Sequence, residues 1–147
     1  MSLTLAEFLD TYGQNTTNNF QLLRWAKELK IPNFHYAMRD EIKQLTKSRL
    51  PINIIANYQM SNESGSHHVA IHKTKDKSYY FDSFGIEPLK EAQAFLGHGV
   101  YSTFKIQPDN SKACGSIALF VLFSLNQGKD FFDTVLELNG YFNSDFK

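Results

Sequence analysis

The stretch from Ala113 to Asn126 reads ACGSIALFVLFSLN, and it is apolar on nearly every side. A helix without a polar face has to be buried all round. We therefore expect a central helix here, with Gly128 as its stop and the rest of the chain packed around it. Cys114 falls in the first turn of this helix, just after Ser111, which is a good N-cap residue.

The segments on either side of this helix follow two patterns. Runs of β-branched and apolar residues predict strands, and apolar residues three or four apart predict helices. The expected strands are Pro51 to Tyr58, His67 to Lys73, Ser78 to Phe84 and Val100 to Gln107, and the second and third form a hairpin. The expected helices are Leu5 to Gly13, Phe20 to Ile31, Met38 to Leu45, Glu87 to Leu96 and Phe131 to Leu138. This order predicts a single α+β domain over residues 1–147, with a small mixed sheet flanked by helices and a cysteine at the start of the buried helix.

Composition argues against several classes of protein. The 15 Lys and Arg residues balance the 15 Asp and Glu residues, so the charge gives no support for nucleic-acid binding through phosphate neutralisation. The longest apolar run, Ile117 to Leu125, is too short to span a membrane. The N-terminus lacks the basic and then apolar pattern of a signal peptide. Because Cys114 is the one cysteine, no internal disulfide can form, and we expect a reducing, intracellular setting.

The position of Cys114 at the start of the helix indicates a reactive thiol. A thiol in the first turn of a helix lies near the positive end of the helix dipole and near unpaired backbone N–H groups. That environment lowers the pKa of a cysteine, and the thiolate is the nucleophilic form. Gly115 follows and leaves room for a substrate backbone. The alternative is a small buried thiol of the core, which is what most lone cysteines are.

The expected hairpin brings a histidine and a carboxylate together. Alternation along its first arm places His67 on one face and His68 on the other. A four-residue loop from Lys73 to Asp76 puts His67 directly opposite Asp82. A carboxylate beside an imidazole fixes the tautomer and orientation that a general base requires. A register slip of one residue puts His68 in that place instead, and a surface ion pair is the alternative to any catalytic role.

Gln107 ends the last expected strand, ahead of a turn that leads into the cysteine helix. Its side-chain amide can point toward the space above the sulfur and, with the backbone N–H of Cys114, form an oxyanion hole. An exposed glutamine beside a turn is the alternative. The histidines and the lone cysteine lack the spacing of zinc ligands, so we expect no metal and no other cofactor.

Three stretches of the chain resemble the adenovirus-type cysteine proteases, a group that includes the SUMO-specific proteases and the proteases of virophages and Polinton-like elements. The stretches are GSHHVA at residues 65–70, YFDSFG at residues 80–85 and QPDNSKACG at residues 107–115. In that family the site residues follow the order His, Asp or Glu, Gln, Cys, and the same order occurs here. The resemblance implies a papain-like cysteine proteinase fold with this adenain-type order.

The resemblance also implies a cysteine endopeptidase that matures a viral capsid precursor. The implied roles are Cys114 as nucleophile, His67 as base, Asp82 as its carboxylate partner and Gln107 as oxyanion donor. The implied substrate carries small residues at the cleaved bond and is cut in the virion or in the infected cell. Where the family has a large aromatic residue after the histidine, this chain has His68. The adenovirus enzyme is activated by a disulfide-linked peptide, which a chain with no second cysteine cannot bind in that way.

Three other functions compete with this prediction. An isopeptidase that removes ubiquitin-like tags would use the same residues. A protease-like fold retained as a capsid or partner-binding module would have lost one of them, and none is lost here. A nucleic-acid-binding domain has little in its favour beyond scattered lysines.

Overall fold

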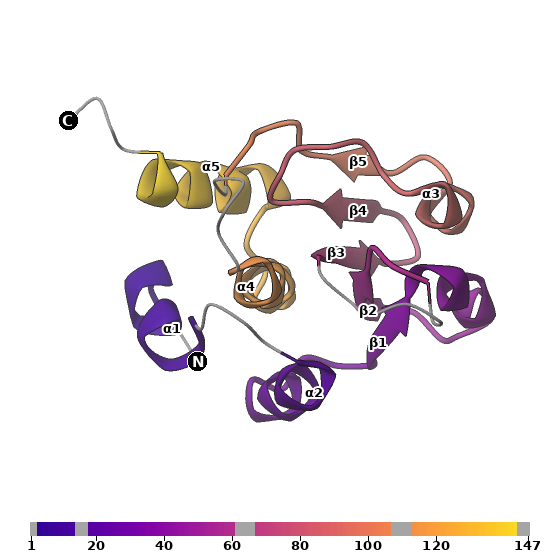
Figure 1. Ribbon diagram of the computed structural model, residues 1–147, viewed down its shortest axis with the longest axis horizontal. Helices are drawn as coiled ribbons and strands as arrows, with labels where there is room; N and C mark the ends of the chain where they lie inside the picture. The colour runs from indigo at the N-terminus through magenta and orange to yellow at the C-terminus, as the bar shows by residue number, and fades with distance from the viewer. Residues whose placement is uncertain (1–2, 14–17, 61–66, 107–112, 144–147) are drawn as a thin grey trace.

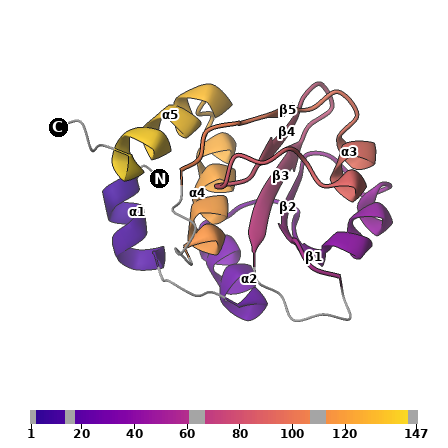
Figure 2. The ribbon, with the colours of Figure 1, turned by 45° about the horizontal axis from the view of Figure 1, so that its top comes forward.

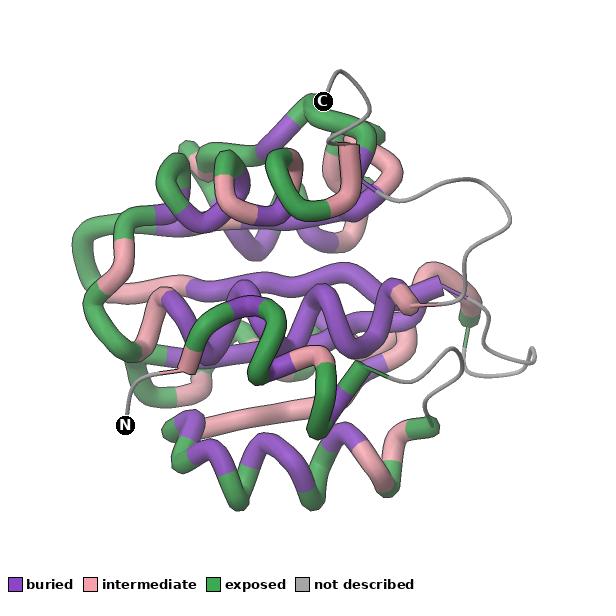
Figure 3. Tube along the Cα trace, turned by 90° about the vertical axis from the view of Figure 1, so that its left-hand side faces the viewer, coloured by how far each residue is buried: buried purple, intermediate pink, exposed green. Residues whose placement is uncertain are grey.

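The buried helix lies at the centre of the fold. A computed structural model describes residues 3–13, 18–60, 67–106 and 113–143 of the chain. Helix α4 (Cys114–Asn126) is buried from its first residue as far as Ser124. It packs on the sheet and is surrounded by α1 (Leu5–Tyr12), α2 (Asn19–Glu28) and α5 (Phe131–Phe142) (Figure 1). The prediction of a central helix is confirmed, and Figure 3 shows the buried residues gathered between the exposed outer surfaces of the surrounding helices.

A five-stranded mixed sheet lies beside α4. Its strands are β1 (Phe34–Met38), β2 (Ile52–Asn57), β3 (His68–Lys73), β4 (Ser78–Phe81) and β5 (Val100–Tyr101), and they follow one another across the sheet in that order. The outer pairs β1–β2 and β4–β5 are parallel, and the inner pairs are antiparallel. Figure 2 shows α4 running alongside this sheet. The predicted α+β class, with a small mixed sheet flanked by helices, is therefore confirmed.

Both faces of the sheet are covered, because side chains alternate along each strand. Ile55, Ala70 and Phe81 pack with α4 on one face. Ile54, Ile71 and Tyr80 point to the other face, which is covered by the 3₁₀ helix η1 (Arg39–Leu45) and by α3 (Lys90–Leu96). Each fully buried side chain of this size contributes about 1.5–3 kcal/mol relative to an exposed one. The central strands are thus fixed from both sides.

Polar caps start the outer helices. Thr4 and Asn18 each form a capping box at the start of α1 and α2, and the Asp130 carboxylate accepts a hydrogen bond from Asp133 N–H at the start of α5. Such caps satisfy backbone donors that the first helical turn leaves unpaired. None of the helices within the described ranges has the length and apolar character needed to cross a membrane.

The first half of the chain differs from prediction at three places. Strand β1 was not expected, because it becomes a strand only through parallel pairing with β2, a long-range contact. The segment expected as a helix from Met38 to Leu45 is the 3₁₀ helix η1, and Met38 ends β1. Helix α2 stops at Glu28, ahead of the expected Ile31, because Lys30 adopts a left-handed φ of 59°.

The hairpin prediction was wrong in register. Lys73 pairs with Ser78, so the loop comprises residues 74–77 in place of the expected loop from Lys73 to Asp76. The Thr74 side chain accepts hydrogen bonds from the N–H groups of Asp76 and Lys77, at 3.3 and 3.0 Å. These bonds stabilise the observed loop. The strand partners are consequently shifted by two residues, which leaves every side chain on the face that was predicted.

Two further predictions around α4 were wrong. The strand expected over Val100 to Gln107 ends at Tyr101, because the chain leaves the sheet and the N–H of Ile106 bonds to the Ser83 carbonyl at 2.8 Å. The N-cap of α4 is Ala113 in place of Ser111, which lies outside the described residues, and the Ala113 side chain forms no cap. The first turn closes through a backbone bond of 3.0 Å from Ile117 N–H to the Ala113 carbonyl.

Candidate active site

A tight turn after β4 holds the carboxylate of Asp82. One of its oxygens, Oδ1, accepts a hydrogen bond of 2.9 Å from the N–H of Phe84, and the Asp82 carbonyl accepts one of 2.8 Å from the N–H of Gly85. Gly85 has a φ of +71°, and a Cβ atom there would lie 2.6 Å from the Thr103 carbonyl oxygen. This position therefore requires glycine. The sequence Asp-Ser-Phe-Gly builds the turn that fixes the carboxylate.

His67 lies against this carboxylate. Its Nε2 is 2.8 Å from Asp82 Oδ1, and the Asp82 side chain is fully buried. Two aromatic rings enclose the imidazole: Phe84 stacks on it at 4.3 Å between centroids, and Tyr58 meets it edge-on at 5.2 Å. Burial and the charge of Asp82 raise the pKa of Tyr58 to about 12, so its hydroxyl stays protonated. The ring of His67 thus has a fixed plane and a fixed partner.

Cys114 begins α4 beside both histidines. The sulfur accepts a hydrogen bond of 3.4 Å from the backbone N–H of His68, and it lies 3.8 Å from His68 Nδ1. The side chain of His67 also interacts with the sulfur and lowers the pKa of the thiol. Because Nε2 of His67 is bonded to Asp82, Nδ1 is the nitrogen left to bond the sulfur. The sulfur also lies at the positive end of the α4 dipole.

These contacts shift the pKa values of the pair in opposite directions. Burial alone would raise the pKa of the Cys114 thiol, but hydrogen bonds from His67 and His68 outweigh it and lower the pKa from 9.0 to about 6. Burial alone would lower the pKa of His67, but its bonds to Asp82 and Cys114 outweigh burial and raise the pKa from 6.5 to about 9. Between these values the pair exists as thiolate and imidazolium, the reactive form of a cysteine nucleophile.

The structure brings three of the four predicted site residues together. His67, Asp82 and Cys114 form one continuous array, although Asp82 reaches His67 from the turn after β4 and is not its cross-strand partner. Gln107 lies outside the described residues. His68, the alternative for the base, contacts the sulfur, and its other ring nitrogen is bonded to Tyr36. Within the described part of the chain, no group of three or more His, Cys, Asp or Glu side chains could hold a metal ion.

Four residues of the site were not singled out from sequence. Tyr58 and Phe84 enclose His67, while Tyr36 and Asn57 extend the contacts of His68. Phe84 lies in the stretch YFDSFG and could have been suspected from it. Tyr36 and Asn57 lie in β1 and β2, and Tyr58 directly follows β2, so these three meet the histidines only after the strands have paired, and no local pattern marks them.

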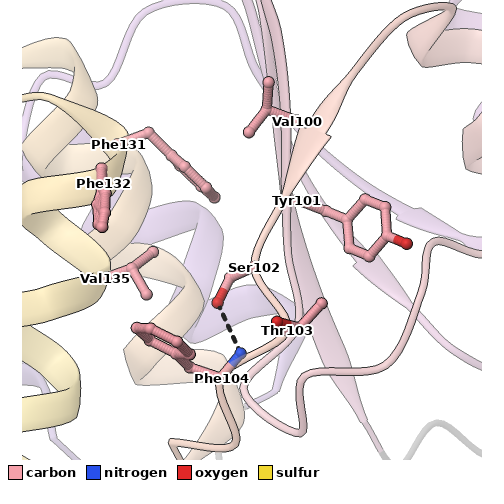
Figure 4. A pocket seen from close by; sticks show the side chains of 8 residues that line it. All are labelled: Val100, Tyr101, Ser102, Thr103, Phe104, Phe131, Phe132 and Val135. Carbon is pink, nitrogen blue, oxygen red and sulfur yellow. Dashed lines mark hydrogen bonds between the residues drawn. The ribbon is translucent and has the colours of Figure 1, made fainter.

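An apolar pocket lies elsewhere on the molecule, between the end of the sheet and α5. Phe131, Phe132 and Val135 of α5 face the segment from Val100 to Phe104 across a cavity of about 230 Å³ (Figure 4). The Ser102 hydroxyl within it accepts a hydrogen bond from the N–H of Phe104 at 3.1 Å. None of the lining residues belongs to the array around the sulfur.

The pKa values predict how Cys114 reacts with alkylating reagents. Because only the thiolate reacts, the rate with iodoacetamide should rise with pH through a midpoint of about 6. Mass spectrometry reports this residue alone, since the sequence has one cysteine. The matched control is the chain in denaturant, where the midpoint should lie near the ordinary value of 9.0. A folded protein that also titrates near 9.0 would contradict the array.

Comparison with known proteins identifies the fold. A crystal structure of the ASFV pS273R protease aligns with 88% of this chain and 67% of that chain, at a TM-score of 0.61 and 16% sequence identity. A second crystal structure of that protease, from its Se-Met form, aligns with 88% of this chain and 68% of that chain, at a TM-score of 0.58 and 16% identity. At this identity the likeness shows a shared fold. No family model matches the chain, and no curated protein matches it.

Proposed function

We propose that this chain is a cysteine endopeptidase that hydrolyses peptide bonds through a thioester. The observation that carries the proposal is the 2.8 Å bond between Asp82 and His67, together with the lowering of the Cys114 pKa by His67 at the start of a buried helix. The fold shared with a viral protease supports it. A carboxylate, an imidazole and a thiol in this order are what a nucleophilic cysteine requires.

In the first half of the reaction, the thiolate of Cys114 attacks the carbonyl carbon of the scissile bond. The carbonyl oxygen becomes an oxyanion, which the backbone N–H of Cys114 and the side chain of Gln107 stabilise. The intermediate then collapses, and the carbon–nitrogen bond breaks as the imidazolium of His67 transfers its proton to the leaving amine. The products of this step are a thioester on Cys114 and a free amine.

In the second half, neutral His67 takes a proton from water as that water attacks the thioester. The carbon–sulfur bond breaks, and the acid product leaves. The thiolate returns, paired again with imidazolium. Asp82 keeps the ring in one orientation throughout and favours its charged form, which the raised pKa of His67 expresses.

Gln107 gives a prediction for the oxyanion. Replacing Gln107 with alanine removes one hydrogen-bond donor and should cost about 2.7–4 kcal/mol of transition-state stabilisation, which is about 10²- to 10³-fold in kcat. Steady-state kinetics on a peptide substrate measure this loss. The rate of Cys114 alkylation should remain that of wild type, because no oxyanion forms in that reaction. Unchanged kcat would remove Gln107 from the oxyanion hole.

The proposed substrate is a viral capsid precursor cut at a bond between small residues, in the reducing interior of the infected cell or the virion. This follows from the resemblance of the three quoted stretches to maturation proteases. The test is coexpression with the cognate capsid precursor, with Cys114→Ala as the control. Cleavage by wild type alone supports the proposal, and an intact precursor opposes it.

Two further measurements, added to the precursor assay, decide between the competing functions. Incubation with conjugates of ubiquitin-like proteins should leave their isopeptide bonds intact, whereas cleavage there and not in the precursor assigns an isopeptidase. A chain that binds the precursor, cleaves neither substrate and shows a thiol midpoint near 9.0 is a binding module.

A further inference from the structure

A second set of contacts reaches the sulfur of Cys114, and the mechanism above does not use it. His68 approaches the sulfur with two nitrogens, its backbone N–H at 3.4 Å and its Nδ1 at 3.8 Å. Its other ring nitrogen, Nε2, is 2.8 Å from the Tyr36 hydroxyl, which in turn lies 3.1 Å from Asn57 Nδ2. These side chains come from β1, β2 and β3 and lie together because the strands pair side by side.

The positions of the hydrogens in this series of hydrogen bonds, from Asn57 through Tyr36 to His68, can be assigned from one backbone hydrogen bond. The N–H of Gln59 is a donor only, and it lies 2.9 Å from the Asn57 side chain, so that atom is the amide oxygen Oδ1. The Asn57 nitrogen therefore faces Tyr36 and donates to its oxygen. With that acceptor position filled, the Tyr36 hydroxyl donates its own hydrogen to His68 Nε2. A ring that accepts this hydrogen at Nε2 carries its own proton on Nδ1, which lies 3.8 Å from the sulfur.

We propose that His68, oriented by Asn57 and Tyr36, is a second hydrogen-bond donor to the sulfur of Cys114 and holds the thiolate in place for attack. His68 offers the sulfur two donors, its backbone N–H and its Nδ1–H, and neither proton is transferred during the reaction. His67, by contrast, transfers its proton to the leaving amine. His68 therefore stabilises the thiolate before it attacks the substrate, and again when the carbon–sulfur bond of the thioester breaks. Tyr36 and Asn57 act through His68 and are positioning residues.

The charges around the cluster agree with this assignment. Burial raises the pKa of Tyr36, the bond from Asn57 lowers it, and the negative charges of Cys114 and Glu41 raise it, with a net increase. The Tyr36 hydroxyl thus remains a donor. Hydrogen bonds from His68 are among the causes that lower the pKa of Cys114. Among the described residues, His67 with Asp82 is the other titratable pair that acts on the sulfur.

The test is the pH dependence of Cys114 alkylation in four variants. Tyr36→Phe removes the hydroxyl that donates to Nε2, so His68 is no longer held in the tautomer with its proton on Nδ1. The alkylation midpoint should then rise by about one pH unit, which is the effect of losing a hydrogen bond to a charged group. His68→Phe removes the ring donor and should raise the midpoint at least as much. His68→Asn offers an amide N–H near the position of Nδ1 and should restore most of the shift. Tyr101→Phe, at an exposed position outside the cluster, is the matched control and should titrate as wild type.

Midpoints that remain at the wild-type value in both Tyr36→Phe and His68→Phe would overturn the inference. Should His68→Phe fail to fold, as far-UV circular dichroism would reveal, Tyr36→Phe decides alone. The role in peptide hydrolysis rests on the proposed function, but the alkylation readout does not. If the wild-type midpoint is low and rises in the variants, but the protein cleaves no substrate, the proposed protease function is wrong and the role of His68 as a hydrogen-bond donor stands. If the protein cleaves its substrate but the variants have the wild-type midpoint, the protease function stands and the role of His68 is wrong.

Discussion

Replacing Cys114 with alanine is expected to abolish peptide hydrolysis and leave the protein folded. Where a nucleophile and its base act as a unit, loss of the nucleophile costs about 10⁶-fold in kcat, because no other group can form the covalent intermediate. The fold should survive, since the core around α4 is built by neighbours such as Ile117 and Phe120. The cost of leaving the His68 N–H without its acceptor should be about 1–3 kcal/mol. Cleavage of a peptide substrate and a thermal melt measure the two effects.

Cys114→Ser is the matched control for this substitution. It changes one atom and keeps a hydrogen-bond acceptor beside His68, so its stability should be closer to that of wild type. Its activity should be nearly as low as that of the alanine variant, because the array is tuned to form a thiolate and a serine hydroxyl is far less acidic. Turnover by the alanine variant within tenfold of wild type would assign the hydrolysis to another residue or to a contaminant.

The central helix could be predicted from sequence because its pattern is local. Eleven consecutive residues from Cys114 are buried, which is the condition that an all-apolar segment demands. Strand β1 could not be predicted in this way. The run Phe34 to Met38 becomes a strand through parallel pairing with β2, and its burial pattern shows only Ala37 fully enclosed. Such strands depend on distant partners more than on their own composition.

The contact between His67 and Asp82 was predicted for a reason that proved partly wrong. The register error was two residues, and neither side chain is part of the observed ladder, because β3 begins at His68 and β4 ends at Phe81. The contact itself arises from the turn after β4, where Asp82 bonds to the N–H of Phe84 and turns toward the imidazole. The relation of His68 to Tyr36 and Asn57 had no such signal, because three separate strands have to pair before these side chains meet.

The second large effect is expected from His67→Ala, which should lower kcat by about 10⁶-fold, as loss of the base does in comparable catalytic arrays. The substitution removes the hydrogen bond and the positive charge that His67 brings to the sulfur, so the alkylation midpoint should rise from about 6 toward 9.0. Peptide cleavage and alkylation over a range of pH are the two measurements. His68→Phe should retain far more activity at high pH, since the base remains and only the thiolate is less stabilised.

The geometry also predicts chemical rescue of His67→Ala. Removing the imidazole ring leaves a space between Phe84, which stacks on the ring, and Tyr58, which meets it edge-on. Free imidazole fits the chemistry of that space, because Asp82 remains to accept one of its N–H groups. Added imidazole should therefore raise turnover by His67→Ala in a concentration-dependent manner and leave Cys114→Ala inactive, since no nucleophile is present there. Greater damage from His68→Phe than from His67→Ala at every pH would instead move the base to the neighbouring position and remove Asp82 from the mechanism.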